Sequence, residues 1–328
     1  MTAVRKVNWG IVSTARIGFN RVIPAIQQSE NGRVVAIASR SLSKAREVAQ
    51  SLEIPEIFGS YDELIESTRV DAVYIPLPNS LHKEVTVLAA EHGKHVLCEK
   101  PLALNADECA EMISACKSSS VWLMEAFMYR FHPQIVKLKE MVSAESVGKI
   151  SAIRTAFRTP QADLSDIRYK RELGGGALYD LGCYCVNVTR LLLGDEPIRV
   201  HGAARFNDRT GTDETFAGTL EFPGLEIGLF DCAFRSTLQQ RLEVVGDGGT
   251  LELPAPFLPG DAPEILKHIN TGVDERVAIE TANSYRRMVE HFNECILDDR
   301  APSYPPTDGL NNLRVIDALF NSISDGRN

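Results

Sequence analysis

The chain has 328 residues, 44% hydrophobic and 24% charged, a composition that predicts a globular protein of two domains with no apolar run near the ~20 residues of a membrane span. A formal net charge of −9 argues against nucleic-acid binding, which needs a basic face. Seven cysteines without a C-x-x-C pair predict neither a disulfide framework nor a metal site, and because residues 1–6 lack the apolar segment of a signal peptide, we expect a cytoplasmic protein.

The first 124 residues predict a Rossmann dinucleotide-binding domain. Short apolar strands alternate there with helical patterns, which is typical of a parallel, doubly wound sheet. The expected strands lie at 7–12, 33–39, 71–77, 95–100 and 121–127, and the expected helices at 43–52, 80–92 and 105–117.

The first strand leads into Ser13-Thr14-Ala15-Arg16-Ile17-Gly18, a tight turn before a helical pattern. This is the setting in which G-x-G-x-x-G binds a pyrophosphate, and Ser13 and Ala15 are small enough to let phosphate approach the backbone. The second strand ends at Ser39-Arg40-Ser41, with Lys44 a turn later, where NAD-binding folds carry an acid for the ribose 2′-hydroxyl. Because these residues suit a 2′-phosphate instead, we expect NADP, with NAD also possible.

A lysine forms the carboxyl end of the strand expected at 95–100, in the segment Glu99-Lys100-Pro101. Ligands bind at the carboxyl ends of strands in open α/β sheets, and Pro101 ends the strand because it cannot donate a ladder hydrogen bond. We therefore expect the Lys100 ammonium group at the active crevice, where it can take part in proton transfer.

The second half of the chain, 125–328, predicts an α+β domain with an antiparallel sheet. Its expected strands are at 149–158, 198–206, 214–222, 225–234, 240–246 and 249–253, and few helices lie between them. The stretch 254–271 is the least structured by composition, and an amphipathic helix at 304–322 is expected to pack back on the first domain. Helices at 175–193 and 281–298 are expected to cover one face of the sheet. The other face is expected to carry Leu220, Phe222, Leu229 and Phe230 and to join two subunits.

Between the two halves, three glycines at 174–176 precede a helical pattern that runs to about residue 193. In a regular helix Asp180 and Tyr184 share one face, one turn apart, so that a carboxylate and a phenol can address the same small substrate. A phenol near a cation such as Lys100 can transfer a proton to or from a carbonyl or hydroxyl oxygen. Cys183 and Cys185 on this helix are interpreted as packing residues.

These segments resemble the glucose-fructose oxidoreductase/inositol dehydrogenase (Gfo/Idh/MocA) family over essentially the whole chain. Glu99-Lys100-Pro101 matches its E-K-P motif, and Asp180-Leu181-Gly182-Cys183-Tyr184 matches its D-x-G-x-(H/Y) segment in the tyrosine form. The segment 124–133 is most similar to the branch that contains D-xylose dehydrogenase and dihydrodiol dehydrogenase. The resemblance implies a Rossmann domain followed by an α+β domain with a large open antiparallel sheet that supplies a homodimer or higher oligomer contact.

The resemblance also implies roles for further residues. Leu77, Pro78, Asn79 and His82 match the family loop along the cofactor, Glu99 belongs to the cofactor site, and Arg158 and Arg168 contact cofactor or substrate oxygens. Lys100, Asp180 and Tyr184 become catalytic and substrate-binding residues.

The expected reaction is reversible hydride transfer between NADP(H) and a sugar carbinol or carbonyl, as in D-xylose 1-dehydrogenation. Two enzymatic alternatives stay open, a ketoreductase acting on a nucleotide-linked ketosugar and a trans-dihydrodiol dehydrogenase. A third alternative is a non-catalytic protein that senses NADP, although such a sensor would need neither Lys100 nor Tyr184.

Overall fold

The computed structural model describes residues 5–269 and 274–325, which group into two compact units. Unit 1 comprises Met1–Met128 and Asn283–Leu310, and unit 2 comprises Tyr129–Ala282 and Asn311–Asn328. We expected one division, at residue 124, whereas a second segment from the C-terminal part of the chain groups with unit 1. Within the described ranges, no helix is long and apolar enough to cross a membrane, and the cytoplasmic location stays a prediction.

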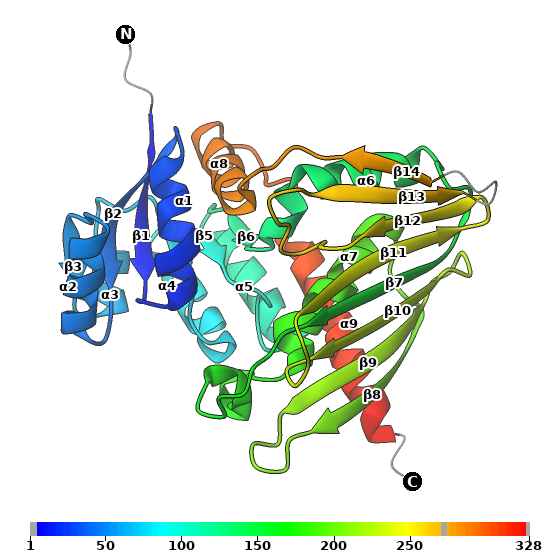
Figure 1. Cartoon of the computed structure of the whole chain (residues 1–328). Helices are drawn as coiled ribbons and strands as arrows, with labels where there is room; N and C mark the ends of the chain where they lie inside the picture. The colour runs from blue at the N-terminus through cyan, green and yellow to red at the C-terminus, as the bar shows by residue number, and fades with distance from the viewer. Residues whose placement is uncertain (1–4, 270–273, 326–328) are drawn as a thin grey trace. The chain divides into compact units, whose positions relative to one another are not determined.

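Unit 1 contains a six-stranded sheet with the order β3-β2-β1-β4-β5-β6, in which every strand pairing is parallel (Figure 1). The doubly wound sheet is thereby confirmed, and its strands form because they are apolar along both faces. The strands are β1 (Val7–Val12), β2 (Gly32–Ala38), β3 (Glu56–Phe58), β4 (Ala72–Ile75), β5 (His95–Cys98) and β6 (Leu123–Glu125). The helical segments are η1 (Gly18–Val22), α1 (Ile23–Gln28), α2 (Leu42–Ser51), α3 (Tyr61–Glu66), η2 (Asn79–Leu81), α4 (His82–Glu91), α5 (Ala106–Ser118) and α8 (Ser284–Leu297).

Helix α8 corrects one expectation. We expected a helix at 281–298 to cover the sheet of the second domain, but α8 packs on α1, β1 and β2 of unit 1. Its buried Asn293 accepts a hydrogen bond from the Trp9 indole nitrogen, with Nε1 and Oδ1 2.8 Å apart. The Trp9 and Phe292 rings also pack with their centroids 5.9 Å apart. A buried Trp N–H needs such an acceptor, which ties this late segment to the first strand.

Unit 2 contains an eight-stranded sheet with the order β14-β13-β12-β11-β7-β10-β9-β8. Its pairings are antiparallel except that β10 runs parallel to β7, so the sheet is mostly antiparallel and the expected α+β domain is confirmed. The strands are β7 (Ile150–Arg158), β8 (Arg199–Phe206), β9 (Asp213–Glu221), β10 (Ile227–Ala233), β11 (Gln239–Gly246), β12 (Gly249–Leu253), β13 (Glu264–Ile269) and β14 (Asp274–Ala278). The helical segments are η3 (Met128–Phe131), α6 (Pro133–Ser143), η4 (Ile167–Tyr169), η5 (Arg171–Leu173), η6 (Leu178–Gly182), α7 (Cys183–Leu193) and α9 (Pro306–Asp325). We expected the C-terminal helix to pack on the first domain, but only residues 306–310 of α9 group with unit 1, and its remaining residues group with unit 2.

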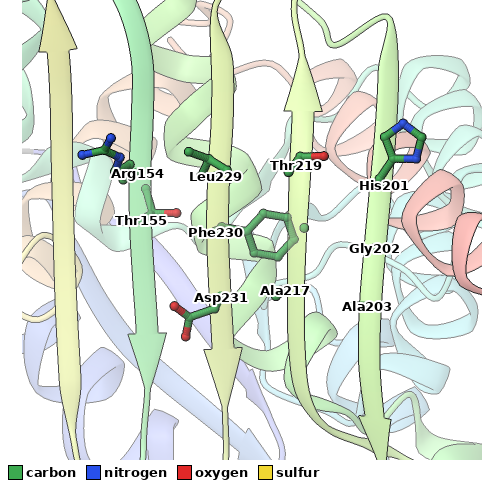
Figure 2. Close-up of a pocket in the computed structure, with 11 residues that line it drawn as sticks. Arg154, Thr155, His201, Gly202, Ala203, Ala217, Thr219, Leu229, Phe230 and Asp231 are labelled. Carbon is green, nitrogen blue, oxygen red and sulfur yellow. The ribbon is translucent and has the colours of Figure 1, made fainter.

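One face of this sheet is covered by helices of unit 2. Helix α7 packs on β7 and β10, and Phe320 of α9 meets Phe216 of β9 edge to face at 5.9 Å. Of Leu220, Phe222, Leu229 and Phe230, which we expected on the uncovered face, Leu220, Phe222 and Phe230 are buried. The alternation of a strand places Leu229 on the opposite face, which we call the outer face, where it is 37% exposed. Figure 2 shows this outer face across β7, β8, β9 and β10.

Candidate active site

The turn between β1 and η1 follows the dinucleotide-binding pattern with a serine at its first glycine position. Ser13 has a φ of 120°, a backbone region that favours glycine. Its hydroxyl donates to the Pro76 carbonyl at 3.3 Å and accepts from the Ala15 N–H at 3.2 Å. The serine side chain therefore stabilises this turn with two hydrogen bonds that a glycine could not form.

The residues expected at a 2′-phosphate lie on the next loop. The buried Ser39 hydroxyl accepts the Ser41 N–H at 3.2 Å, Arg40 is exposed, and helix α2 has no acid in its first turn. Lys44 of α2 and Arg16 of the first turn line one hollow of about 310 Å³, which also contains Glu47. The two cations, and the absence of an acid from the first turn of α2, suit a dinucleotide that carries a 2′-phosphate better than one with a free 2′-hydroxyl.

Lys100 lies just beyond the carboxyl end of β5 and is half-buried. Its neighbour Glu99, expected at the cofactor, accepts a hydrogen bond from the buried Tyr74 hydroxyl, with the two oxygens 2.6 Å apart. Burial, together with the adjacent Glu99 carboxylate, raises the pKa of Tyr74, so this phenol remains a hydrogen-bond donor. The loop that carries Lys100 is therefore attached to β4 through a carboxylate and a phenol.

His82, expected along the cofactor, is instead fully buried at the start of α4. Its Nε2 lies 2.9 Å from the Leu77 carbonyl oxygen, and its Nδ1 lies 3.0 Å from the Pro101 carbonyl oxygen. Burial lowers the pKa of His82 to about 4, and the nearby Lys100 charge acts in the same direction. The ring is therefore a contact between two loops. Leu77 is buried, while Pro78 and Asn79 of the same loop are half-buried.

Tyr184 and Asp180 lie in different surroundings within unit 2. Residues 178–182 are π-helical, with i to i+5 hydrogen bonds, so the spacing of four residues does not close a regular turn there. Tyr184 is 6% exposed, and the rings of Tyr129, Phe157 and Phe257 pack around it at centroid distances of 5.7, 5.4 and 5.3 Å. These contacts fix the plane of the Tyr184 ring.

Asp180 forms an ion pair with Arg168, in which Nε and Oδ2 are 2.7 Å apart. Arg168 also bonds Asp166 at 3.2 Å, and the Asp180 carboxylate beside it raises the pKa of the guanidinium group. The structure thus brings Arg168, expected at the cofactor, to Asp180.

Arg158 points away from Tyr184. It forms an ion pair with Asp231 across the outer face of the sheet, whereas its neighbour Phe157 packs on Tyr184 at the helix-covered face. Successive side chains of a strand point to opposite faces, so Arg158 and Tyr184 are separated by the sheet itself.

Comparison with known proteins identifies the fold. Residues 7–127 match the family model described as "Oxidoreductase family, NAD-binding Rossmann fold", and residues 135–252 match the "GFO/IDH/MocA C-terminal domain". The chain belongs to the Gfo/Idh/MocA oxidoreductase family. The expected family and branch are confirmed by relatives that are named for sugar and dihydrodiol oxidation.

Three members of this family illustrate the range of substrates. The chain is 38% identical to D-xylose 1-dehydrogenase (NADP(+)) 2 of Haloferax volcanii, with 97% of this chain and 98% of that protein covered. It is 35% identical to trans-1,2-dihydrobenzene-1,2-diol dehydrogenase of Xenopus laevis, with 88% and 89% covered. Its fold is similar to that of a 3-ketoreductase from Actinomadura kijaniata in complex with NADP and TDP-benzene, with a TM-score of 0.93, 26% identity and 97% and 98% covered.

Two parts of the candidate site are not signalled by the local sequence. The aromatic contacts of Tyr184 come from distant segments, and Phe257 lies in the stretch that composition marked as least structured. Asp213 accepts the Leu178 N–H at 2.7 Å at the start of the helix that carries Asp180 and Tyr184. No local pattern signals this pairing, since the two residues are 35 positions apart.

Proposed function

We propose that the protein is an NADP(H)-dependent oxidoreductase that transfers hydride between the nicotinamide and a sugar carbinol or carbonyl, with D-xylose as the first substrate to test. The observation that carries the proposal is the 38% identity to an NADP-dependent D-xylose dehydrogenase over 97% of the chain, with Lys100 and Tyr184 both present. A protein that only sensed NADP would need neither side chain.

The cofactor proposal draws support from the charges in unit 1. Arg16 and Lys44 line a common hollow, and the serines at 39 and 41 are hydrogen-bond partners for phosphate oxygens. When bound, the nicotinamide supplies or accepts the hydride. The Ser13 turn and the residues 77–79 are proposed to hold the rest of the cofactor.

In the proposed mechanism Tyr184 takes the proton of the substrate hydroxyl during oxidation and returns it during reduction. A phenol is a weak acid at neutral pH, so the phenolate needs a cation, and Lys100 is proposed to provide it and to hold the substrate oxygen. The packing of Tyr129, Phe157 and Phe257 fixes the direction of the Tyr184 ring. Asp180, which forms an ion pair with Arg168, is proposed to orient a neighbouring hydroxyl group.

Two other substrates remain candidates because relatives act on them. The dihydrodiol dehydrogenases are named for a trans-1,2-dihydrobenzene-1,2-diol, and the solved 3-ketoreductase carries a TDP-linked ligand. A panel of aldoses, a trans-dihydrodiol and a nucleotide-linked ketosugar, followed by NADPH absorbance, distinguishes the three. Turnover of D-xylose supports the proposal. Turnover of only the trans-dihydrodiol, or of only the nucleotide-linked ketosugar, would instead assign that compound class as the substrate.

We also propose a homodimer through the outer sheet face. This face holds a hollow of about 570 Å³ lined from four strands (Figure 2). Leu229, which lines the hollow, is 37% exposed, and Ile227 at the start of the same strand is 42% exposed. The ion pairs Arg154–Glu243 and Arg199–Glu221 lie on either side. Exposed apolar side chains among mixed charges suit a second copy of the same face about a two-fold axis.

A further inference from the structure

The His82 ring bridges the two loops that follow β4 and β5. These strands are neighbours in the sheet, and their paired residues run from Ala72 and His95 to Ile75 and Cys98. One further backbone hydrogen bond, from the Glu99 N–H to the Ile75 carbonyl at 3.1 Å, continues the ladder. Beyond it, the ring spans the Leu77 and Pro101 carbonyl oxygens at 2.9 and 3.0 Å.

The other side of the Lys100 loop is attached as well. The Leu102 N–H donates to Oε1 of the buried Glu125 at 2.9 Å, and Glu125 belongs to β6, the next strand of the sheet. Glu99, Pro101 and Leu102 each have a backbone group attached to a neighbouring strand or loop. The main chain is therefore held in place both before Lys100, at Glu99, and after it, at Pro101 and Leu102.

The ring suits this position chemically. Burial lowers the pKa of His82 to about 4, so near neutral pH the imidazole is neutral and donates to one of the two carbonyl oxygens. The tautomer that holds the Lys100 loop is the one in which Nδ1 carries the proton and donates to the Pro101 carbonyl oxygen. Because His82 is fully buried, water does not replace a hydrogen bond that is lost there. A side chain of similar size without a donor would leave the two carbonyl oxygens facing an apolar ring.

We propose that His82 is a positioning residue for Lys100, which holds the loop of that ammonium group through the Pro101 carbonyl. The inference rests on the proposed function, in which Lys100 takes part in proton transfer. Misplacement of a reacting group by about 1 Å can cost roughly 10²-fold in rate. Releasing this loop should therefore lower kcat while the cofactor still binds.

The test uses three variants of the full-length protein. His82→Phe removes both contacts, His82→Asn keeps a donor near the Nδ1 position facing Pro101, and His82→Gln keeps one near the Nε2 position facing Leu77. We expect His82→Phe and His82→Gln to lose roughly 10-fold or more in kcat with D-xylose and NADP, and His82→Asn to recover most of it. NADPH binding, measured by fluorescence, should persist in His82→Gln, which keeps the contact to the loop at 77–79. His92→Phe, an exposed histidine that follows the same helix, is the matched control.

Hydrogen exchange in the absence of substrate gives a readout other than activity. The amides of residues 99, 100 and 102–104 should exchange faster in His82→Phe and His82→Gln than in His82→Asn. Equal kcat and equal exchange in the Asn and Gln variants would overturn the inference, and this comparison decides even if His82→Phe does not fold. Lys100→Ala is assayed in parallel. Loss of activity in Lys100→Ala with wild-type turnover in all His82 variants refutes the role of His82 alone, whereas full activity of Lys100→Ala refutes the proposed function.

Discussion

The buried Asp213 carboxylate should make the stability of unit 2 depend on pH. Asp213 is 2% exposed at the start of β9, and its Oδ2 accepts the Leu178 N–H at 2.7 Å. Gly176 is packed against it so closely that a Cβ there would lie 2.1 Å from Oδ1. The perturbation is Asp213→Asn, whose amide oxygen can still accept the Leu178 N–H but which cannot ionise.

The magnitude follows from the shifted pKa. Burial raises the pKa of Asp213 from 3.8 to about 6. Because the folded value is the higher one, the folded state favours the protonated carboxyl. Its stabilising contribution is complete below pH 3.8 and is lost as the pH rises to about 6. A pKa shift of this size changes the free energy of unfolding by ~3 kcal/mol between the two ends of this pH range.

Urea unfolding of the wild type and Asp213→Asn, followed by far-UV ellipticity at several pH values, measures this difference. Both tryptophans belong to unit 1, so ellipticity is the better probe of unit 2. The free energy of unfolding of Asp213→Asn should rise relative to that of the wild type as the pH increases from about 4 to about 6. The exposed Asp208→Asn is the control. A difference between wild type and Asp213→Asn that stays constant with pH would refute the reasoning.

Two further predictions concern the cofactor and the dimer. Arg40→Asp should weaken NADP(H) binding by roughly 10-fold or more and favour NAD(H), because the carboxylate repels a 2′-phosphate. Calorimetric titration of both cofactors decides this, and tighter binding of NAD(H) than of NADP(H) to the wild type contradicts it. Leu229→Glu should shift the mass measured by light scattering toward that of the 36.2 kDa chain, while Leu258→Glu, at an exposed leucine outside the outer face, should not. A wild type that is already monomeric at micromolar concentration rules out the proposed interface.

Local sequence patterns predicted the Rossmann strands because apolar runs alternate with helices there. They missed β3 and α3, which are three and six residues long and too short to show a period. The stretch 254–271 was judged the least structured, yet it contains β13, because pairing with β12 and β14 outweighs its proline-rich surroundings. Residues 270 and 271 lie outside the described residues.

The candidate site divides in the same way. Lys100 and Tyr184 were found through short motifs that belong to one segment each. The partners of these segments come from elsewhere: Asp213 for the helix start, Phe257 for the tyrosine ring and Arg168 for Asp180. Such pairings depend on tertiary contacts, which local periodicity does not encode.

The central claim is that Lys100 and Tyr184 serve one proton transfer. Initial rates of NADP reduction with D-xylose should fall by roughly 10²- to 10⁴-fold in Lys100→Ala and in Tyr184→Phe. The rate of the double variant should be little lower than that of either single variant, because the effects of mutating residues that act as a unit are not additive. Wild-type turnover by Tyr184→Phe, or losses that multiply in the double variant, would contradict the account.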